Sequence, residues 1–239
     1  MSTDDHAKPW ETVRRGLLLL VSSPAGAGKT SLTRRLVADY GDLSLSISAT
    51  TRDPRPGEQD GREYHFKTRA EFEAMIAADD FLEWAVVNGN YYGTPKAPVM
   101  KALEGGHDVL FDIDWQGAKQ IAEQAPDDSV RLFILPPVWG DLERRLRARA
   151  QDSEAVMAAR LELGREEIAH WASYDYVIVN KNFDRAYADL VHIYRAERMK
   201  PGRNPWLPGF VRELLDEAAQ MAGDALEPPK TARLRPVQK

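Results

Sequence analysis

The sequence contains no cysteine among its 239 residues. Without a thiol the chain can form no disulfide framework, no thiolate metal site and no cysteine nucleophile. A chain without disulfides fits a reducing compartment, so we expect a cytoplasmic protein. Histidines are few as well, and His6, His65, His107, His170 and His192 show none of the short spacings typical of metal ligands.

A long apolar run is also missing. The longest, Gly16–Val21, falls far short of the roughly 20 apolar residues that a membrane-spanning helix needs. It is also too short, and followed too abruptly by polar residues, to serve as a secretion signal. A formal net charge of -5 argues against a constitutive binder of nucleic acid or of a membrane surface. We therefore expect neither a nucleic-acid partner nor a membrane partner.

What the sequence does contain is an alternation of short apolar runs and helical stretches. Leu17–Val21 is a continuous apolar run of strand length, as expected for a buried parallel strand. A loop of small residues and a helical stretch that ends near Gly41 follow it. Later runs at 109–111, 130–135 and 176–179 predict further strands. This rhythm predicts an α/β fold with a parallel sheet flanked by helices.

The segment from about 44 to 94 has a different character. Tyr64–Phe66 predicts a short strand, and Thr68–Glu71 matches a capping box at the start of a helix. Phe81–Tyr92 predicts a hairpin around Asn88-Gly89, with a type I′ turn. We interpret this segment as a small α+β insertion into the α/β core.

The strongest motif is a phosphate-binding loop between the first strand and the first helix. Glycines let its backbone N–H groups turn inward around an anion, and the helix N-terminus adds its positive dipole end. Lys29 can reach the β and γ phosphates of ATP, and the Thr30 hydroxyl can bind Mg²⁺. The first position, Ser23, departs from the usual glycine, although a small residue can serve that turn. The loop consists of Ser23, Pro24, Ala25, Gly26, Ala27, Gly28, Lys29 and Thr30.

Two carboxylates, Asp112 and Asp114, follow the strand Val109–Phe111. At the carboxyl end of a parallel strand they are expected beside the phosphate loop. There Asp112 could organise Mg²⁺, partly through water. The alternative is a structural role, because an aspartate after a strand is often the cap of the next helix. The nearby phosphate loop is the reason to favour a role in binding Mg²⁺.

Two arginine clusters are open to more than one interpretation. Arg52 and Arg55, with Tyr64 nearby, could clamp a monophosphate, because guanidinium forks match phosphate oxygens. The alternative is a solvated basic turn. The run Arg144–Arg149 could be a lid over phosphates, a solvated helix face or a nucleic-acid patch, and its position after a core strand favours the lid.

Six further motifs follow one another along the chain. They are Ser46–Glu58, Asn88–Thr94, Asp112–Gly117, Ile134–Pro137, Arg145–Arg149 and Val177–Asn180. Together, and in this order, they resemble the guanylate kinase family. The resemblance covers about 16–199 and implies a P-loop kinase fold. It implies that the γ-phosphoryl group of ATP is transferred to GMP, giving ADP and GDP, with Mg²⁺ as cofactor, as in purine nucleotide metabolism and GMP recycling.

The resemblance also implies roles for single residues. Asn180 is implied near the adenine of ATP, and Lys29, Arg52 and the lid arginines are the catalytic set. A carboxylate such as Glu83 suits the N1–H and N2–H₂ donors of guanine, whereas adenine would leave it unpaired. The implied GMP site contains Ser48, Arg52, Arg55, Tyr64, Glu83, Tyr92, Thr94, Asp112 and Asp114. The implied lid arginines are Arg145, Arg149 and Arg160.

The predicted organisation places one kinase-like domain between two extensions. Residues 1–14 form a flexible arm, and 201–239 form an extension with a helix over 209–226 and a basic tail. That helix could pack on the core, form a subunit contact or do little, so the formation of a homo-oligomer stays open. The predicted domain spans 15–200, with a core of 15–47 and 95–200, a GMP-binding insertion of 48–94 and a helical lid at about 140–160.

Two alternatives remain at the level of sequence. The first is a kinase with another acceptor, such as AMP or a phosphorylated sugar; Arg52, Arg55, Glu83 and Thr94 argue against it. The second is a guanylate-kinase-like interaction module that binds protein partners; the intact phosphate loop argues against that. Whether dGMP also serves as acceptor stays open.

Overall fold

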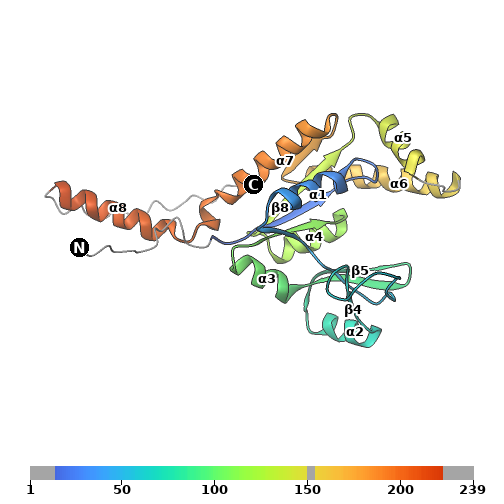
Figure 1. The fold of residues 1–239 in the computed structure, drawn as a ribbon, viewed down its shortest axis with the longest axis horizontal. Helices are drawn as coiled ribbons and strands as arrows, with labels where there is room; N and C mark the ends of the chain where they lie inside the picture. The colour runs from blue at the N-terminus through green and yellow to red at the C-terminus, as the bar shows by residue number, and fades with distance from the viewer. Residues whose placement is uncertain (1–13, 150–153, 223–239) are drawn as a thin grey trace. The chain divides into compact units, whose positions relative to one another are not determined.

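The computed structural model describes residues 14–149 and 154–222. The chain divides into two compact units, Val13–Asn204 and a second unit composed of Met1–Thr12 and Pro205–Lys239. The larger unit contains two sheets and most of the helices (Figure 1). The predicted N-terminal arm lies outside the described residues except for Arg14, whose guanidinium bonds both carboxylate oxygens of Asp108.

A sheet of parallel strands forms the centre of the larger unit. β1 (Leu18–Ser22) lies in the middle of this sheet and is buried along its whole length. Burial on both faces explains why its sequence shows no polar alternation. The predicted strands at 109–111, 130–135 and 176–179 are confirmed, whereas the short β2 was not predicted. The strand order is β2 (Leu43–Leu45), β7 (Asp108–Asp112), β1, β8 (Ser129–Leu135) and β9 (Tyr176–Val179).

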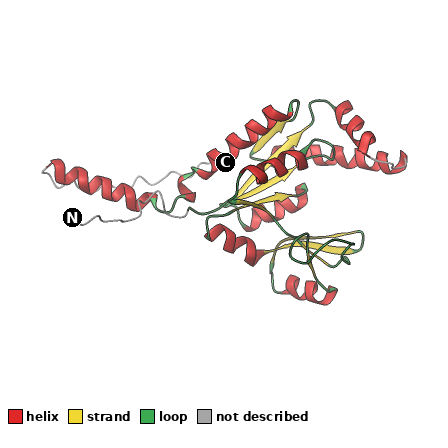
Figure 2. Ribbon diagram, in the orientation of Figure 1, coloured by secondary structure: helices red, strands yellow, loops and turns green. Residues whose placement is uncertain are grey.

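Helices cover both faces of this sheet (Figure 2). The side chains of β1 alternate between two hydrophobic clusters, since Leu19 and Val21 join one cluster and Leu18 and Leu20 the other. The first cluster includes α1 (Lys29–Asp39) and α7 (Phe183–Arg198). The second includes α3 (Lys96–Glu104) and α4 (Trp115–Gln124). This three-layer arrangement brings the carboxyl ends of the strands, and the loops that follow them, to one edge.

The insertion folds as a second sheet with one helix. Its strands lie in the order β4 (His65–Phe66), β3 (Ala49–Thr50), β6 (Asn90–Pro95) and β5 (Phe81–Val87). The predicted hairpin is confirmed, because Asn88 and Gly89 both have positive φ, at 50° and 80°, as a type I′ turn requires. The predicted capping box is confirmed at Thr68, which begins α2 (Arg69–Ala77).

The segment predicted as a lid falls in two helices, α5 (Trp139–Arg149) and α6 (Glu154–Ala169). Residues 150–153, between them, lie outside the described residues. Leu142 and Leu146 of α5 pack with Met157 of α6 in a small apolar cluster. The two helices therefore share a core of their own beside the main sheet.

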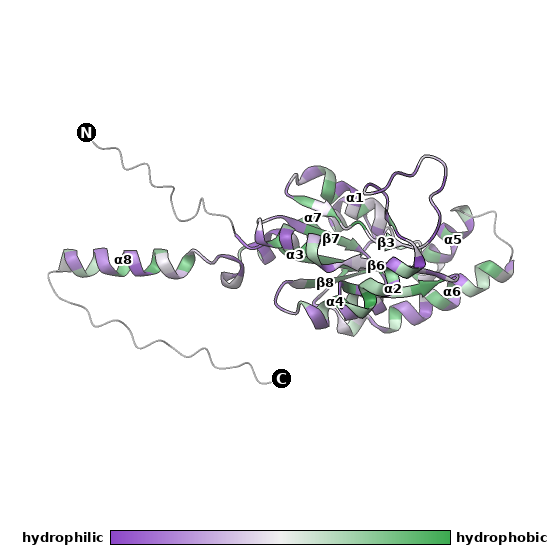
Figure 3. Ribbon diagram, turned by 90° about the horizontal axis from the view of Figure 1, so that it is seen from below, coloured by the Kyte–Doolittle hydropathy of each residue, from purple (hydrophilic) through white to green (hydrophobic). Residues whose placement is uncertain are grey.

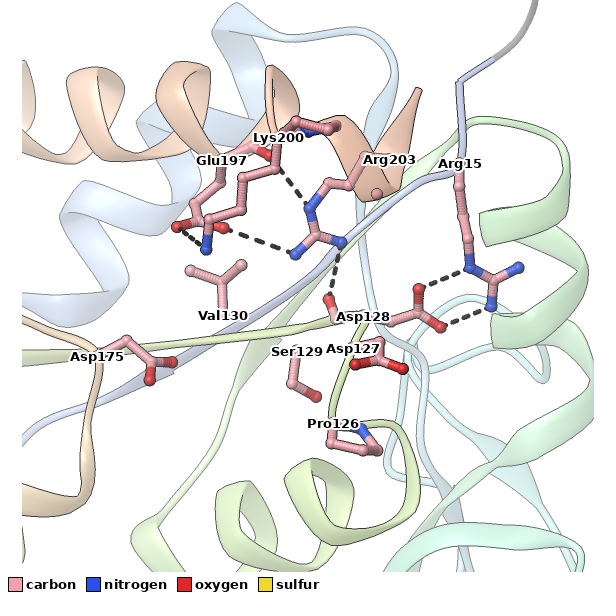
Figure 4. A pocket seen from close by; sticks show the side chains of 12 residues that line it. Arg15, Pro126, Asp127, Asp128, Ser129, Val130, Asp175, Glu197, Lys200 and Arg203 are labelled. Atoms are coloured by element: carbon pink, nitrogen blue, oxygen red, sulfur yellow. Dashed lines mark hydrogen bonds and ion pairs between the residues drawn. The ribbon is translucent and has the colours of Figure 1, made fainter. Parts of the chain in front are cut away.

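The core continues past residue 200, where we predicted its end. A turn of 3₁₀ helix at Pro201–Arg203 carries a buried arginine back into the larger unit. Arg203 donates hydrogen bonds to the backbone carbonyls of Glu197 (3.1 Å), Asp128 (3.3 Å) and Gly16 (3.5 Å). It also lies 3.6 Å from the buried Glu197 carboxylate (Figure 4). Arg203 thus joins the end of α7 to the starts of β1 and β8.

Replacing Arg203 with alanine is expected to lower stability strongly. The change leaves Glu197 buried with fewer partners, and loss of one member of a buried ion pair costs about 3–5 kcal/mol. For a chain of this size, about 3 kcal/mol corresponds to a fall in the thermal midpoint of roughly 6–12 °C, which differential scanning calorimetry would measure. Arg212→Ala, in the exposed part of α8, is the matched control. Equal midpoints for the two variants would show that Arg203 does not hold the core together.

The second unit contains α8 (Leu207–Ala222), an amphipathic helix (Figure 3). Val211, Leu214 and Leu215 are exposed on it. It begins two residues before the predicted start, and the last predicted residues, 223–226, lie outside the described residues. Among the described helices, none combines the length and the apolar character needed to cross a bilayer.

Candidate active site

The phosphate loop connects β1 to α1 and needs glycine at two positions. Gly26 and Gly28 have φ of 91° and 99°, in the left-handed region that favours glycine. At Gly28 space is lacking as well, since a Cβ atom there would lie 2.4 Å from Nδ2 of Asn180. The loop conformation that the sequence motif predicts is therefore present.

Asn180 holds the phosphate loop from the end of β9, which lies two strands away from β1 in the sheet. It follows β9, is 6% exposed, and its Nδ2 donates a 2.8 Å hydrogen bond to the carbonyl oxygen of Ala27. Sequence resemblance implied a place near adenine for this residue. In the structure its amide fixes the backbone of the phosphate loop, a role that the sequence did not reveal.

Lys29, Thr30 and Asp112 form the centre of the site. Nζ of Lys29 lies 2.5 Å from Oδ1 of Asp112 and 3.3 Å from the carbonyl oxygen of Ile113. The Thr30 hydroxyl donates to Oδ2 of Asp112 at 3.4 Å. A hydroxyl beside one carboxylate suits Mg²⁺, which keeps several waters and takes few protein ligands. The described residues contain no group of three potential metal-binding side chains, so phosphate and water oxygens would complete such a site.

A cavity of about 330 Å³ lies between the phosphate loop and the α5–α6 pair; we call it the loop cavity. Arg145 of α5 donates to the carbonyl oxygen of Gly26 at 3.3 Å, and Arg160 of α6 lines the cavity. Arg149 is the last described residue of α5, and its side chain lies outside the description. Glu167 also lines the cavity and was missed, although its spacing of two helical turns from Arg160 would have placed both on one face.

A second cavity, of about 220 Å³, lies between the two sheets; we call it the Glu83 cavity. Ser48, Tyr64, Glu83, Thr94 and Asp112 are among the residues that line it. Glu83 and Thr94 face each other across β5 and β6, and the Thr94 hydroxyl donates to Oε1 of Glu83 at 2.8 Å. Burial raises the pKa of Glu83, an effect that the Thr94 hydrogen bond opposes and the charge of Asp114 reinforces.

Asp114 begins α4 next to this cavity. Its carboxylate accepts a 2.9 Å hydrogen bond from the backbone N–H of Gly117, which makes it the helix cap. Gly117 allows a close approach, because a Cβ atom there would lie 2.5 Å from Ile113 and 3.5 Å from Oε2 of Glu83. The capping alternative considered for an aspartate after a strand thus applies to Asp114, while Asp112 contacts Lys29.

The arginine loop of the insertion is held by a carboxylate that sequence reasoning missed. Nη2 of Arg52 lies 2.9 Å from both carboxylate oxygens of Glu58, which also accepts a 2.8 Å hydrogen bond from the backbone N–H of Arg55. The guanidinium of Arg52 lies 5.4 Å from the centre of the Tyr64 ring, and the Tyr92 ring is 6.0 Å from that of Tyr64. The structure brings Arg52, Tyr64 and Tyr92 together, while Arg55 is exposed.

Cavity size alone does not identify the site. The largest cavity described, about 850 Å³, lies at the amino end of β8 (Figure 4), and no residue of the phosphate loop lines it. Charged side chains line it, and they pair with one another: Arg15 with Asp128 at 2.6 Å, and Lys200 with Glu197 at 2.8 Å. The chemistry of the phosphate loop is concentrated at the opposite edge.

A phosphate loop on a parallel sheet, with a separate sheet inserted across a second cavity, defines a P-loop kinase. Comparison with known proteins narrows this class: the sequence model of the family described as guanylate kinase matches residues 15–197. The chain belongs to the guanylate kinase family, whose members are nucleotide-binding transferases. Residues after 197, including α8, lie beyond that match.

Individual relatives agree with this assignment. A protein named guanylate kinase from Caulobacter vibrioides is 62% identical over 203 residues, which cover 85% of this chain and 95% of the relative. One from Maricaulis maris is 54% identical over 218 residues, covering 91% of this chain and 100% of the relative. A crystal structure of guanylate kinase from Anaplasma phagocytophilum matches with a TM-score of 0.65 and 34% identity, covering 85% of this chain and 95% of that one.

Proposed function

We propose that this chain transfers the γ-phosphoryl group of ATP to GMP, giving ADP and GDP. One observation carries the proposal beyond the family match. Asp112 lines the Glu83 cavity and also contacts Lys29 and Thr30 of the phosphate loop. Asp112 therefore connects the lining of one cavity to the lining of the other, as expected for two nucleotides that exchange a phosphoryl group.

The loop cavity is the proposed ATP site. Backbone N–H groups of the loop and the start of α1 suit the β and γ phosphates. Lys29 and Arg160 line it and supply positive charge, and Arg145 adds a third cation beside Gly26. Two further parts of the proposal rest on the sequence alone. They are the role of Arg149 as a lid arginine and a contact between Asn180 and adenine. Of the predicted ATP-binding loop, Ser23, Pro24, Ala25, Gly26, Gly28, Lys29 and Thr30 line the cavity, and Ala27 is buried.

The Glu83 cavity is the proposed GMP site. An ionised Glu83 can accept from N1–H and N2–H₂ of guanine, and the hydroxyls of Ser48 and Thr94 can serve O6. Arg52, Arg55 and Tyr64 would bind the phosphate, with Tyr92 and Asp114 at the edge of the site. Glu58 already pairs with Nη2 of Arg52, so a GMP phosphate at that nitrogen would have to displace the Glu58 carboxylate.

The proposed transfer needs no general base. The nucleophile is a phosphate oxygen that is already largely deprotonated at neutral pH, so positioning and charge stabilisation dominate. Lys29 and the arginines offset the charge that develops on the transferring group. Water has to be excluded, and closure of the insertion (48–94) and of a lid at 140–160 over the core (15–47 and 95–200) would do so.

Mg²⁺ fits the proposal as cofactor. Thr30 and Asp112 would hold it, partly through water, and when bound it would neutralise phosphate charge. The cytoplasmic location, the use of dGMP and the role of the extension after residue 200 remain predictions.

The proposal predicts a strict acceptor preference. In a coupled assay of ADP formation with ATP and Mg²⁺, we expect GMP to support turnover, and AMP to be slower by roughly 10⁴-fold in kcat/KM, because it leaves Glu83 unpaired. GMP, dGMP, AMP, CMP and UMP would be compared in turn. Fast turnover with AMP would support kinase activity but refute the assignment of the Glu83 cavity to guanine. Folded protein that binds GMP without turnover would indicate an interaction module instead.

A further inference from the structure

One carboxylate in the loop cavity has no part in the proposed transfer. Glu167 lies near the end of α6 and lines the cavity together with Arg160. Between them, Gly164 faces the phosphate loop, since a Cβ atom at this position would lie 3.7 Å from Cβ of Pro24. Residues 160, 164 and 167 share one helix face, so α6 points a cation and an anion at the same loop.

The surroundings of Glu167 are those that a phosphate group would have. Ala25 and Lys29 line the same cavity as Glu167, and both the backbone N–H of Ala25 and the charge of Lys29 favour the ionised form of its carboxylate. Asp114 and the adjacent Glu166 repel it, and burial, the largest effect, raises the pKa of Glu167. A loop N–H group and the loop lysine are the donors on which the phosphates of a nucleotide depend.

A carboxylate and a phosphate cannot share these donors without cost. Both are anions, and their repulsion is strong in a cavity that is partly shielded from water. Asp112 provides a precedent in the same site, because it neutralises Nζ of Lys29 at 2.5 Å. In the nucleotide-free protein, one carboxylate, that of Asp112, therefore pairs with the lysine, and a second, that of Glu167, lines the cavity beside the loop.

We propose that Glu167 is a placeholder anion of the phosphate loop: its carboxylate shares the loop cavity with Lys29 and Ala25 while the site lacks nucleotide, and ATP has to displace it. The inference rests on the proposed function, which assigns the loop cavity to ATP. Part of the free energy of ATP binding is then used to move Glu167 away, which weakens ATP and ADP binding and favours release of the product.

The test is to remove the charge and keep the shape. Glu167→Gln is expected to lower the Kd of ATP in the presence of Mg²⁺ by about 3–10-fold, since each tenfold change needs only about 1.4 kcal/mol. The Kd of GMP is expected to stay the same. Isothermal titration calorimetry on the full chain measures both. Glu166→Gln is the matched control, because it removes the same charge from the neighbouring, exposed residue.

Weaker ATP binding by Glu167→Gln would overturn the inference, because it would show that the carboxylate assists the bound nucleotide. ATP binding equal to that of Glu166→Gln would overturn it too. A thermal melt checks the fold of each variant; if Glu167→Gln is unfolded, Glu167→Ala replaces it in the same comparison. A wild-type chain that binds no ATP would overturn the proposed function as well, whereas GMP-dependent turnover with no effect of Glu167 would overturn this inference alone.

Discussion

Lys29→Met is expected to lower kcat for GMP phosphorylation by roughly 10²–10³-fold, the usual cost of removing one preorganised charge from a transition state. Methionine keeps most of the length and removes the ammonium group that lies 2.5 Å from Asp112. Asp112 keeps the Thr30 hydroxyl as a partner and is partly exposed, so the fold is expected to survive. The measurement is the initial rate of ADP formation at saturating ATP and GMP.

The matched control for this variant is Lys101→Met. Lys101 is exposed on α3 and lies outside both cavities. The Lys101→Met variant loses the same charge as Lys29→Met, and its kcat is expected to equal that of the wild type. If Lys29→Met retained more than about a tenth of the wild-type kcat, the phosphate loop would not contribute its lysine to the transfer.

Glu83→Gln is expected to lower kcat/KM for GMP by roughly 10²–10³-fold, because the amide presents N–H donors to the donors of guanine. The Kd of ATP is expected to stay unchanged, since Glu83 lines the cavity between the sheets and not the loop cavity. Glu73→Gln, on the exposed side of α2 in the same insertion, is the control. Steady-state kinetics with GMP varied at saturating ATP measure the effect.

The same residue predicts a pH dependence. Burial raises the pKa of Glu83 above its ordinary value, and guanine needs the ionised form. At a pH near or below this raised pKa, GMP binding therefore releases a proton, and the affinity for GMP is expected to fall as the pH drops through that pKa. Glu83→Gln has no such group, so the ratio of wild-type to variant affinity is expected to shrink at low pH. A ratio that does not change with pH would contradict a direct contact between Glu83 and guanine.

The sequence predicted the features whose cause is local. The phosphate loop could be predicted from two glycines, a lysine and a threonine after an apolar run. Each of these residue types acts on the loop backbone or on a phosphate group next to it. Asn88-Gly89 predicted the hairpin for the same reason, since its positive φ values are needed within the turn itself. Continuous apolar runs likewise predicted the strands that are buried on both faces.

Partnerships between distant segments could not be predicted in this way. Asn180 meets the loop 153 residues earlier, and Arg203 reaches Gly16, 187 residues earlier. Glu58 was hidden because an acidic residue near Arg52 is equally compatible with a solvated turn. The position of Glu167 in the loop cavity could not be predicted, because it depends on how α6 packs on Pro24. In each case the residue type is ordinary, and only the fold shows which group it faces.

The register of β1 has a consequence for how the chain is made. Its neighbours are β7 and β8, and the residues that pair with Leu18 are Val109 and Ser129, so both partners leave the ribosome only about ninety or more residues later. Until then the most apolar segment of the protein has no strand to pair with. Contacts of such long sequence separation slow folding and leave unpaired strands prone to aggregation. The stretch that anchors the phosphate loop is thus also the stretch most in need of protection during synthesis.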